Sequence, residues 1–394
     1  MSTIGVCLTR RWIPAVAALG LSVACTPQTF QKALGGTRED KGYSLEETQD
    51  HGYVVAGQSN SFSQAQRSID YLVKTNASGE LEWQNNAYGG DFAVAFAVAQ
   101  LSDGGYLLAG NSLLNTTVGR AYLVRVDSIG ELVWAHDYPQ ALEFDSVRET
   151  ADGNIVVAGV AGISGSTEYD AYLAKLDSNG AVVWERQFGA AGRDWARSIR
   201  QTSDGGFVLA GIGLTVNAAL LKVDADGNLT WRKTYIYSNP LVVFYKHTLY
   251  DVRETPDGGF AAAGWVENFA SERQGWVLRT DAQGTRLWDA LLTPAGSAEL
   301  YSIAPAWNGG YVVAGNADAA DDGNLDAYLA NIDDDGTIQW QKTYGGTGED
   351  AVRAVQKASD GGYALAGWTK SFGAGGRDVY LIKTDGDGNS PATP

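Results

Sequence analysis

Four short segments, each the length of a β-strand, recur in the same order about every 50 residues along the 394-residue chain. The clearest copy spans residues 340–385. Its first segment (351–358) places small or aliphatic residues three apart, and its second (363–367) is continuously apolar. The third (379–384) is also apolar, and the fourth, seen at 337–344, carries a tryptophan. Segments of this length without helical periodicity predict β-strands.

Three landmarks hold these segments in register. An Asp-Gly-Gly turn, or a close variant, begins at Asp50, Asp103, Asp152, Asp204, Asp257, Asn308 and Asp360. An Ala-Gly pair follows in the second segment, with its glycine at Gly57, Gly110, Gly159, Gly211, Gly264, Gly315 and Gly367. An aromatic residue marks the fourth segment at Phe30, Trp83, Trp134, Trp184, Trp231, Trp288 and Trp340. Length alone would suggest two or three domains, but these seven copies indicate a solenoid, array or propeller.

The turns between segments have recognisable sequences. Asp360-Gly361 joins the first and second segments and supplies the positive φ of a tight hairpin. Asp385 and Gly388 follow the third segment with the spacing of a type I turn, and the same pattern recurs in the other copies. Four antiparallel strands per copy favour the blades of a propeller over a β-helix or a helical solenoid.

The two ends of the chain complete one another. The last copy lacks a fourth segment, whereas residues 29–36 match residues 339–346. The sequence therefore predicts an all-β, seven-bladed β-propeller over residues 29–389, closed by the N-terminal strand, with a short tail at 390–394. Closure removes the exposed strand edges of an open array.

The N-terminus differs in kind from the repeats. Arg10 and Arg11 precede an apolar stretch too short to span a bilayer, so residues 1–24 predict a secretory signal. Leu21-Ser-Val-Ala-Cys25 resembles a lipoprotein signal-peptidase box, in which the cysteine takes the lipid. We expect an exported protein lipid-anchored in the cell envelope through Cys25, with residues 25–28 as a tether. An ordinary cleaved signal peptide, giving a secreted protein, is the alternative.

Charge and cysteine content narrow the possible partners. The chain has 46 acidic and 29 basic residues and a net charge of −17, which repels nucleic acid and anionic lipid. Of the two cysteines, Cys7 would leave with the signal and Cys25 would carry lipid. The mature chain would then have no thiol for a disulfide, a metal or catalysis. We expect a monomer that contacts the membrane only through its lipid.

The strand-turn-strand pattern Tyr-Leu-Val-Lys-Leu-Asp-x-x-Gly-x-x-x-Trp resembles the tryptophan-docking repeats of quinoprotein-like β-propellers. With the Tyr-Gly-Gly and Asp-Gly-Gly-Tyr elements, residues 29–389 are more similar to secreted bacterial and archaeal propeller-repeat proteins. The resemblance implies the fold. The vicinal cysteine pair of the quinoprotein enzymes is absent, which argues against a bound quinone, and we expect no cofactor.

Acidic and basic side chains within the repeats have structural interpretations. Acidic clusters such as Asp224-Ala-Asp226 and Asp333-Asp-Asp335 fall in the type I turns, so turn formation explains them. Calcium is possible in the loop that contains Asp318, Asp321, Asp322 and Asp326. One position of the third strand is basic in six copies, and we predict that each base meets a nearby carboxylate. These residues are Lys74, Arg125, Lys175, Lys222, Arg279 and Lys383, with Asn331 as the exception.

The connections of variable length lie on one face of a propeller, and this variable face is the candidate working surface. Its longest insertion spans residues 235–247. Aromatic residues there, with two tryptophans that follow Ala-Gly, could form a rim for a glycan or a peptide, although loop packing is an alternative. They are Tyr235, Tyr237, Phe244, Tyr245, Trp265 and Trp368.

Catalytic chemistry has little support in the sequence. The histidines, His51, His136 and His247, lie in separate copies without the spacing of a triad or a metal site. Four acids before first strands could converge at the channel mouth: Asp91, Asp194, Glu349 and Asp350. The sequence therefore favours a non-catalytic scaffold that binds a protein or glycan. The alternatives are a polysaccharide hydrolase or lyase with carboxylates at the channel mouth, and a quinoprotein-like oxidoreductase.

Overall fold

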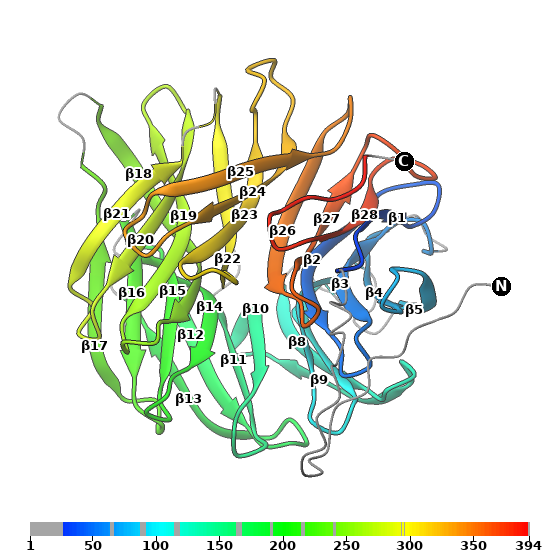
Figure 1. Ribbon diagram of the computed structural model, residues 1–394. Helices are drawn as coiled ribbons and strands as arrows, with labels where there is room; N and C mark the ends of the chain where they lie inside the picture. The colour runs from blue at the N-terminus through cyan, green and yellow to red at the C-terminus, as the bar shows by residue number, and fades with distance from the viewer. Residues whose placement is uncertain are drawn as a thin grey trace, which may run out of the picture.

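The computed structural model describes residues 27–63, 67–86, 92–113, 119–162, 168–189, 192–213, 217–238, 242–292, 294 and 296–392. The signal peptide, Cys25, Asp91 and part of the tether lie outside these residues. Seven four-stranded antiparallel sheets follow one another around a ring, which confirms the predicted propeller (Figure 1). No helix in the described part of the chain has the length and apolar character of a membrane span.

Each of the first six sheets takes four consecutive strands, whose first strand is innermost. The first blade contains β2 (Asp40–Glu47), β3 (Tyr53–Ser59), β4 (Ile69–Thr75) and β5 (Leu81–Asn86), and the second contains β6 (Val94–Gln100), β7 (Tyr106–Ser112), β8 (Arg120–Val126) and β9 (Leu132–Tyr138). The third contains β10 (Ala141–Glu149), β11 (Ile155–Gly162), β12 (Tyr169–Leu176) and β13 (Val182–Phe188), and the fourth contains β14 (Trp195–Gln201), β15 (Phe207–Gly213), β16 (Asn217–Val223) and β17 (Leu229–Tyr235). The fifth contains β18 (Phe244–Glu254), β19 (Phe260–Asn268), β20 (Arg273–Thr280) and β21 (Arg286–Leu292), and the sixth contains β22 (Ala298–Pro305), β23 (Tyr311–Ala317), β24 (Asp326–Ile332) and β25 (Ile338–Tyr344).

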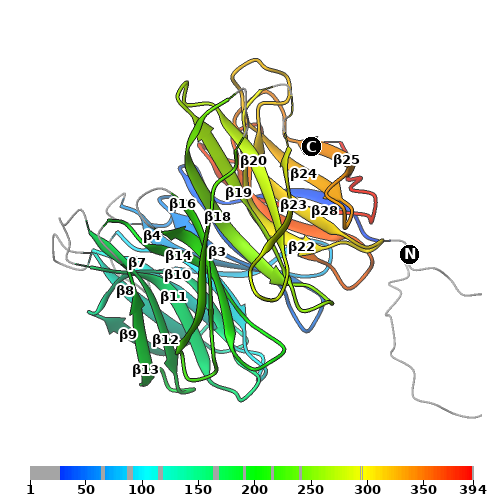
Figure 2. The same cartoon turned by 90° about the vertical axis from the view of Figure 1, so that its left-hand side faces the viewer.

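The seventh sheet joins the two ends of the chain, as predicted. It contains β26 (Asp350–Lys357), β27 (Tyr363–Thr369), β28 (Asp378–Thr384) and the N-terminal strand β1 (Phe30–Leu34). Phe30 lies opposite Lys383 in this antiparallel pair. Figures 1 and 2 show the blue and red ends of the chain together in this blade.

The aromatic residue of each outer strand packs on the glycine of the next blade's type I turn. A Cβ added at Gly388 would lie 2.6 Å from the Trp340 ring, and one at Gly79 would lie 2.5 Å from Phe30. Both glycines have positive φ, so the turn and the aromatic contact each favour glycine there. Phe30 thus contacts the first blade in the way that the tryptophans contact the later blades, and the circle of contacts is complete.

The basic residues of the third strands meet the turn aspartates, which confirms the predicted pairing. Lys222 Nζ lies 2.8 Å from Asp204, and Lys383 Nζ lies 2.8 Å from Asp360. The other pairs are Lys74 with Asp50, Arg125 with Asp103, Lys175 with Asp152, and Arg279 with Asp257. In the sixth blade both members change together, and the Asn331 amide donates to Asn308 at 3.5 Å. Each pair fastens the third strand to the first turn of its own blade.

Candidate binding site in the central channel

A β-bulge interrupts the pairing of the inner strand in every blade. In the last blade, Val352 pairs with Gly367 and Ala354 pairs with Ala366, which leaves Arg353 as the extra residue. A bulge re-aims the side chain of its extra residue. The seven bulged residues all line one central cavity. We call these residues the bulge ring: Tyr43, Phe96, Asp145, Arg197, Tyr250, Tyr301 and Arg353.

The glycine of each Ala-Gly pair makes room for the bulge. A Cβ added at Gly367 would lie 1.9 Å from the carbonyl oxygen of Ala351, two residues before the bulged Arg353. The equivalent distance is 1.7 Å from Gly211 to the carbonyl oxygen of Trp195. Since a side chain at this position would strike the backbone of the inner strand, the repeated glycine is a requirement of the bulge.

Contacts connect the aromatic and basic members of the bulge ring. The rings of Tyr250 and Tyr301 lie 4.8 Å apart, and the Arg353 guanidinium lies 3.5 Å from the centre of the Tyr301 ring. On the other side of the channel, the rings of Tyr43 and Phe96 lie 5.6 Å apart. These side chains are half-buried, as expected of groups that line a channel. The channel therefore presents aromatic surface and charge at the same level.

Two carboxyl groups of the third blade lie close together at the channel: Asp145 of the bulge ring and Glu143, two residues before it. Arg197 donates to Asp145 at 2.8 Å, and the Trp195 indole donates to the other oxygen of Asp145 at 2.6 Å. The Asn111 amide donates to Glu143 at 3.1 Å. Burial, followed by the nearby charge of Asp145, raises the pKa of Glu143 well above its usual value. Glu143 therefore retains a proton to a higher pH than an exposed glutamate.

A serine and aspartate layer follows the bulge ring along the inner strands. The Asp251 carboxylate accepts hydrogen bonds from Ser198 at 2.8 Å and from Ser302 at 3.2 Å, and so connects three neighbouring blades. Arg200 and Arg253 donate to the same carboxylate at 2.8 and 2.9 Å. Burial alone would raise the pKa of Asp251, but the two arginines hold it below its usual value.

Arginines come next along the inner strands of three adjacent blades. We call Arg148, Arg200 and Arg253 the arginine layer; all three line the cavity. Burial, then their mutual repulsion, lowers the pKa of Arg200. Glu46 is the acid of this layer, and burial raises the pKa of its carboxyl group. The arginine layer thus contains more positive than negative charge.

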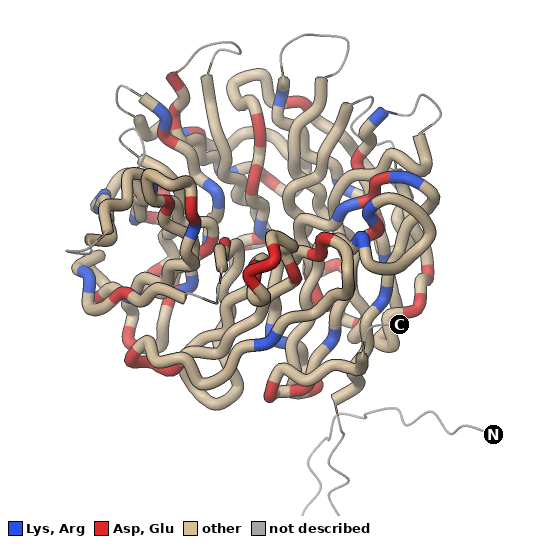
Figure 3. The backbone as a smooth tube through the Cα atoms, turned by 90° about the horizontal axis from the view of Figure 1, so that it is seen from above, with Lys and Arg blue, Asp and Glu red and all other residues tan. Residues whose placement is uncertain are grey.

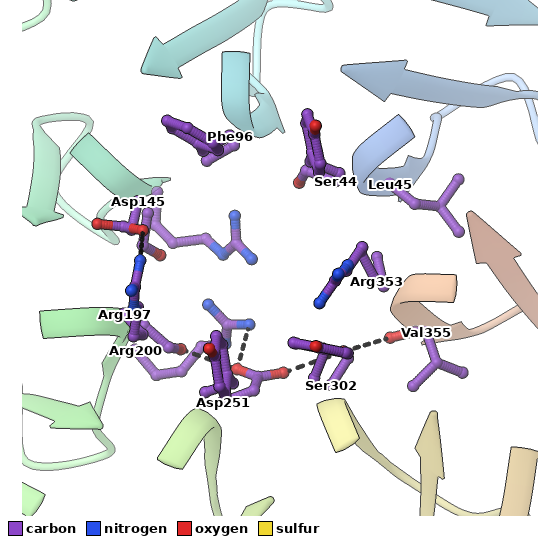
Figure 4. Close-up of a pocket in the computed structure, with 18 of the residues that line it drawn as sticks. Ser44, Leu45, Phe96, Asp145, Arg197, Arg200, Asp251, Ser302, Arg353 and Val355 are labelled. Atoms are coloured by element: carbon purple, nitrogen blue, oxygen red, sulfur yellow. Dashed lines mark hydrogen bonds and ion pairs between the residues drawn. The ribbon is translucent and has the colours of Figure 1, made fainter. Parts of the chain in front are cut away.

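The cavity enclosed by these residues has a volume of about 270 Å³ (Figure 4). Five arginines and two aspartates line it, an excess of three positive charges. The chain as a whole has a net charge of −17, and the acidic residues are spread over the blades and their loops (Figure 3). The central cavity is therefore a basic site within an acidic protein.

Two of the aromatic residues predicted from the sequence stand behind the bulge ring. Trp265 lies 6.4 Å from Tyr250, and Trp368 lies 6.1 Å from Tyr43 and 4.8 Å from the Arg353 guanidinium. Both tryptophans are buried. They support the residues that line the cavity, and their contact with a ligand stays a prediction.

The other four predicted aromatic residues lie in the fourth and fifth blades. Tyr235 is buried, and its hydroxyl donates to the carbonyl oxygen of Gly284, an inter-blade contact. Phe244 is buried against Tyr237, with ring centres 5.6 Å apart. Tyr245 is exposed and stacks on Phe269 at 5.1 Å. The structure thus does not bring these four together with Trp265 and Trp368 into one exposed rim.

The predicted acids occupy loop contacts. Asp194 is buried and pairs with Arg232, whereas Glu349 pairs with Lys370 at 3.0 Å and Arg377 at 2.8 Å. Asp350 accepts a hydrogen bond from the Gly346 amide at 2.9 Å. None of these three lines the cavity, and Asp91 lies outside the described residues.

The possible calcium loop is organised by its own backbone. The Asp318 carboxylate accepts hydrogen bonds from the amides of Asp322 at 3.0 Å and Gly323 at 2.9 Å. Burial, followed by Asp350, raises the pKa of Asp326 to about 6. Within the described ranges, no group of three or more His, Cys, Asp or Glu side chains is arranged to hold a metal ion.

Comparisons with known proteins support the fold. The chain is similar to the structure of the Pan2 WD40 domain of Neurospora crassa, with a TM-score of 0.54 and 11% identity over 93% of this chain and 98% of that one. It is also similar to Sqt1 from Chaetomium thermophilum, with a TM-score of 0.51 and 13% identity over 86% of this chain and 82% of that one. No protein-family model matches the sequence, and comparison with curated proteins gave no match. At these identities the likeness shows a shared β-propeller fold and nothing finer.

Proposed function

We propose that this chain is a non-catalytic binding scaffold whose central channel receives part of a protein or glycan partner. The observation that carries this proposal is the bulge ring. Seven bulges direct chemically different side chains toward one cavity, where aromatic rings stand beside charged groups that can fix the orientation of a ligand. The likeness to a WD40 domain agrees with a scaffold role.

The cellular setting of the proposal comes from the first 25 residues. A lipid on Cys25 would hold the propeller at the cell envelope, and the acidic surface would keep it away from nucleic acid. Since the tether between Cys25 and β1 is short, the seventh blade would lie near the membrane. The proposed partner is then an envelope protein or a polysaccharide.

Binding to immobilised oligosaccharides and peptides tests this function. We expect the purified chain to bind one class and Phe96→Ala and Tyr301→Ala to lose that binding with little change in Tm, because both side chains are half-buried at the channel. Phe269→Ala is the matched control, since this aromatic side chain is 77% exposed on a loop away from the channel. Loss of binding in the control alone would place the binding surface on the loops and contradict the proposal.

A further inference from the structure

Arg353 is the arginine of the bulge ring that makes no ion pair or hydrogen bond within the described residues, although Glu299 attracts its charge from a distance. Arg197 pairs with Asp145, whereas no side chain or carbonyl oxygen of the described residues accepts a hydrogen bond from Arg353, and its Nε is buried without an acceptor. Burial lowers the pKa of Arg353, but an arginine stays charged at any physiological pH. Only Nε is buried without an acceptor, whereas the rest of the half-buried guanidinium borders the cavity, where a ligand could supply the acceptor.

Aromatic rings fix the orientation of this guanidinium. Arg353 lies 3.5 Å from the centre of the Tyr301 ring and 4.8 Å from that of Trp368. Figure 4 shows Arg353 directed into the open centre of the pocket, while Arg197 lies against Asp145. An arginine held between rings keeps its N–H groups aligned for a planar, bidentate acceptor. Carboxylates have that geometry.

The arginine layer adds positive charge further along the same cavity. Arg200 and Arg253 share the single carboxylate of Asp251, and Arg148 donates only to backbone carbonyl oxygens, at 2.7 and 3.3 Å. An anion in the cavity would therefore be attracted from more than one side. Because the rest of the protein is acidic, the attraction for an anion is confined to the channel. The shape of the channel would then determine which anions bind.

The other residues that line the cavity indicate which chemical group is attached to the anion. Tyr43, Phe96, Tyr250 and Tyr301 offer ring faces at the level of Arg353. A volume of about 270 Å³ lies at the small end of ligand sites, enough for about one sugar ring. We propose that the channel binds an acidic sugar, free or at the end of a polysaccharide, with its carboxylate on Arg353 and its ring against the tyrosines. This inference rests on the proposed binding function and names its ligand class.

Calorimetric titration with glucuronate and galacturonate tests the inference, with glucose and galactose as neutral counterparts. We expect binding of at least one uronate and roughly 10- to 100-fold weaker binding in Arg353→Met, because a hydrogen-bonded charge contact is lost. The Tm of the unliganded Arg353→Met chain should stay close to that of the unchanged protein, since the half-buried guanidinium makes no ion pair within the described residues and methionine can still pack on the rings. Arg186→Met is the matched control, because Arg186 lies 5.4 Å from the Trp184 ring on an outer strand and should leave uronate binding unchanged.

Other ligands separate failure of this inference from failure of the proposed function. Tighter binding of inorganic phosphate, or of a peptide with a free C-terminal carboxylate, would overturn the acidic-sugar assignment but keep a ligand-binding channel. Equal binding of neutral and acidic sugars would do the same. A fall in Tm with unchanged uronate affinity in Arg353→Met would show a structural arginine and overturn the inference. If none of these sugars, anions and peptides bound in a way that depends on the bulge ring, the proposed function itself would fail.

Discussion

The aromatic residues of the outer strands repeat from blade to blade, whereas the bulged residues of the inner strands differ. At the outer aromatic position, six blades carry tryptophan and one carries phenylalanine, and each ring packs on a turn glycine. At the bulged position of the inner strand, the seven blades carry three tyrosines, two arginines, a phenylalanine and an aspartate. The register shift falls at the same position of the inner strand in every blade. The difference teaches that the repeated residues build the ring, whereas the residues that vary at one fixed backbone position give the channel its chemistry.

Removing an outer aromatic residue should produce the largest loss of stability. Trp231 packs on Gly284 and lies 5.7 Å from the Phe260 ring, so Trp231→Ala should lower the free energy of unfolding by about 3 kcal/mol or more. Chemical denaturation measures this change, and affinity for a channel ligand should be unaffected. Trp307 is 44% exposed, and its replacement by alanine should cost less. Equal losses in both variants would remove the distinction between repeated and other tryptophans.

Gly367→Ala should affect both regions at once. The added Cβ would lie 1.9 Å from the carbonyl oxygen of Ala351, so the bulge must shift. We expect a loss of about 2 kcal/mol in the free energy of unfolding, together with weaker uronate binding because Arg353 is displaced. Gly119→Ala is the control, since its nearest neighbours lie 3.8 Å away. Unchanged stability and binding in Gly367→Ala would contradict the role given to the repeated glycine.

The sixth blade lacks the basic and acidic pair of the other six blades, so substitutions there can measure what such a pair contributes to stability. Asn331→Lys buries a cation without its acid and should destabilise the protein, whereas adding Asn308→Asp should restore much of the loss. We expect a coupling free energy of about 1–2 kcal/mol from a double-mutant cycle followed by chemical denaturation. Additive effects would mean that the pair contributes no more than its separate members.

Low pH should weaken these ion pairs, and the expected loss of stability is smaller than the losses expected for the variants above. Hydrogen bonds from Thr255 and Arg279 hold the pKa of Asp257 at about 2 in the folded chain, below the usual value of 3.8. A lowered carboxyl pKa stabilises the folded state above pH 4, and this contribution is lost as the pH falls from about 4 through 2. Solvent screens the exposed carboxylate, so the effect is modest. In Arg279→Met, the slope of unfolding free energy against pH in this window should be shallower; an unchanged slope would contradict the assignment.

The fold could be predicted from the sequence because each repeated landmark residue meets a requirement of the backbone that recurs in the seven blades. Gly388 needs positive φ, and Asp360 begins a tight turn, so the sequence alone shows strand boundaries. The match between residues 29–36 and 339–346 also predicted ring closure, and the pairing of β1 with β28 confirms it.

The candidate site was less predictable because no residue type marks a bulge. Arg353 and Tyr250 read as ordinary polar or aromatic positions of a half-buried strand. The available signal was the glycine of Ala-Gly, since a repeated glycine inside a strand indicates close backbone approach. Trp265 and Trp368 directly follow that glycine, and both lie beside residues of the bulge ring. Tyr235 and Phe244 belong to a long connection, and the length of a connection gives no information on the burial of its residues.

The shared seventh blade also has a consequence for how the protein matures. Phe30 is synthesised long before Lys383, its partner in the antiparallel pair, so this sheet cannot form until the seventh blade has been made. The other six sheets need only consecutive segments. A circular permutant that carries β1 directly after β28 would replace this distant pairing with a local hairpin, and should therefore fold faster. In the native order, we expect the nascent chain to stay open to proteases and chaperones until the seventh blade has emerged.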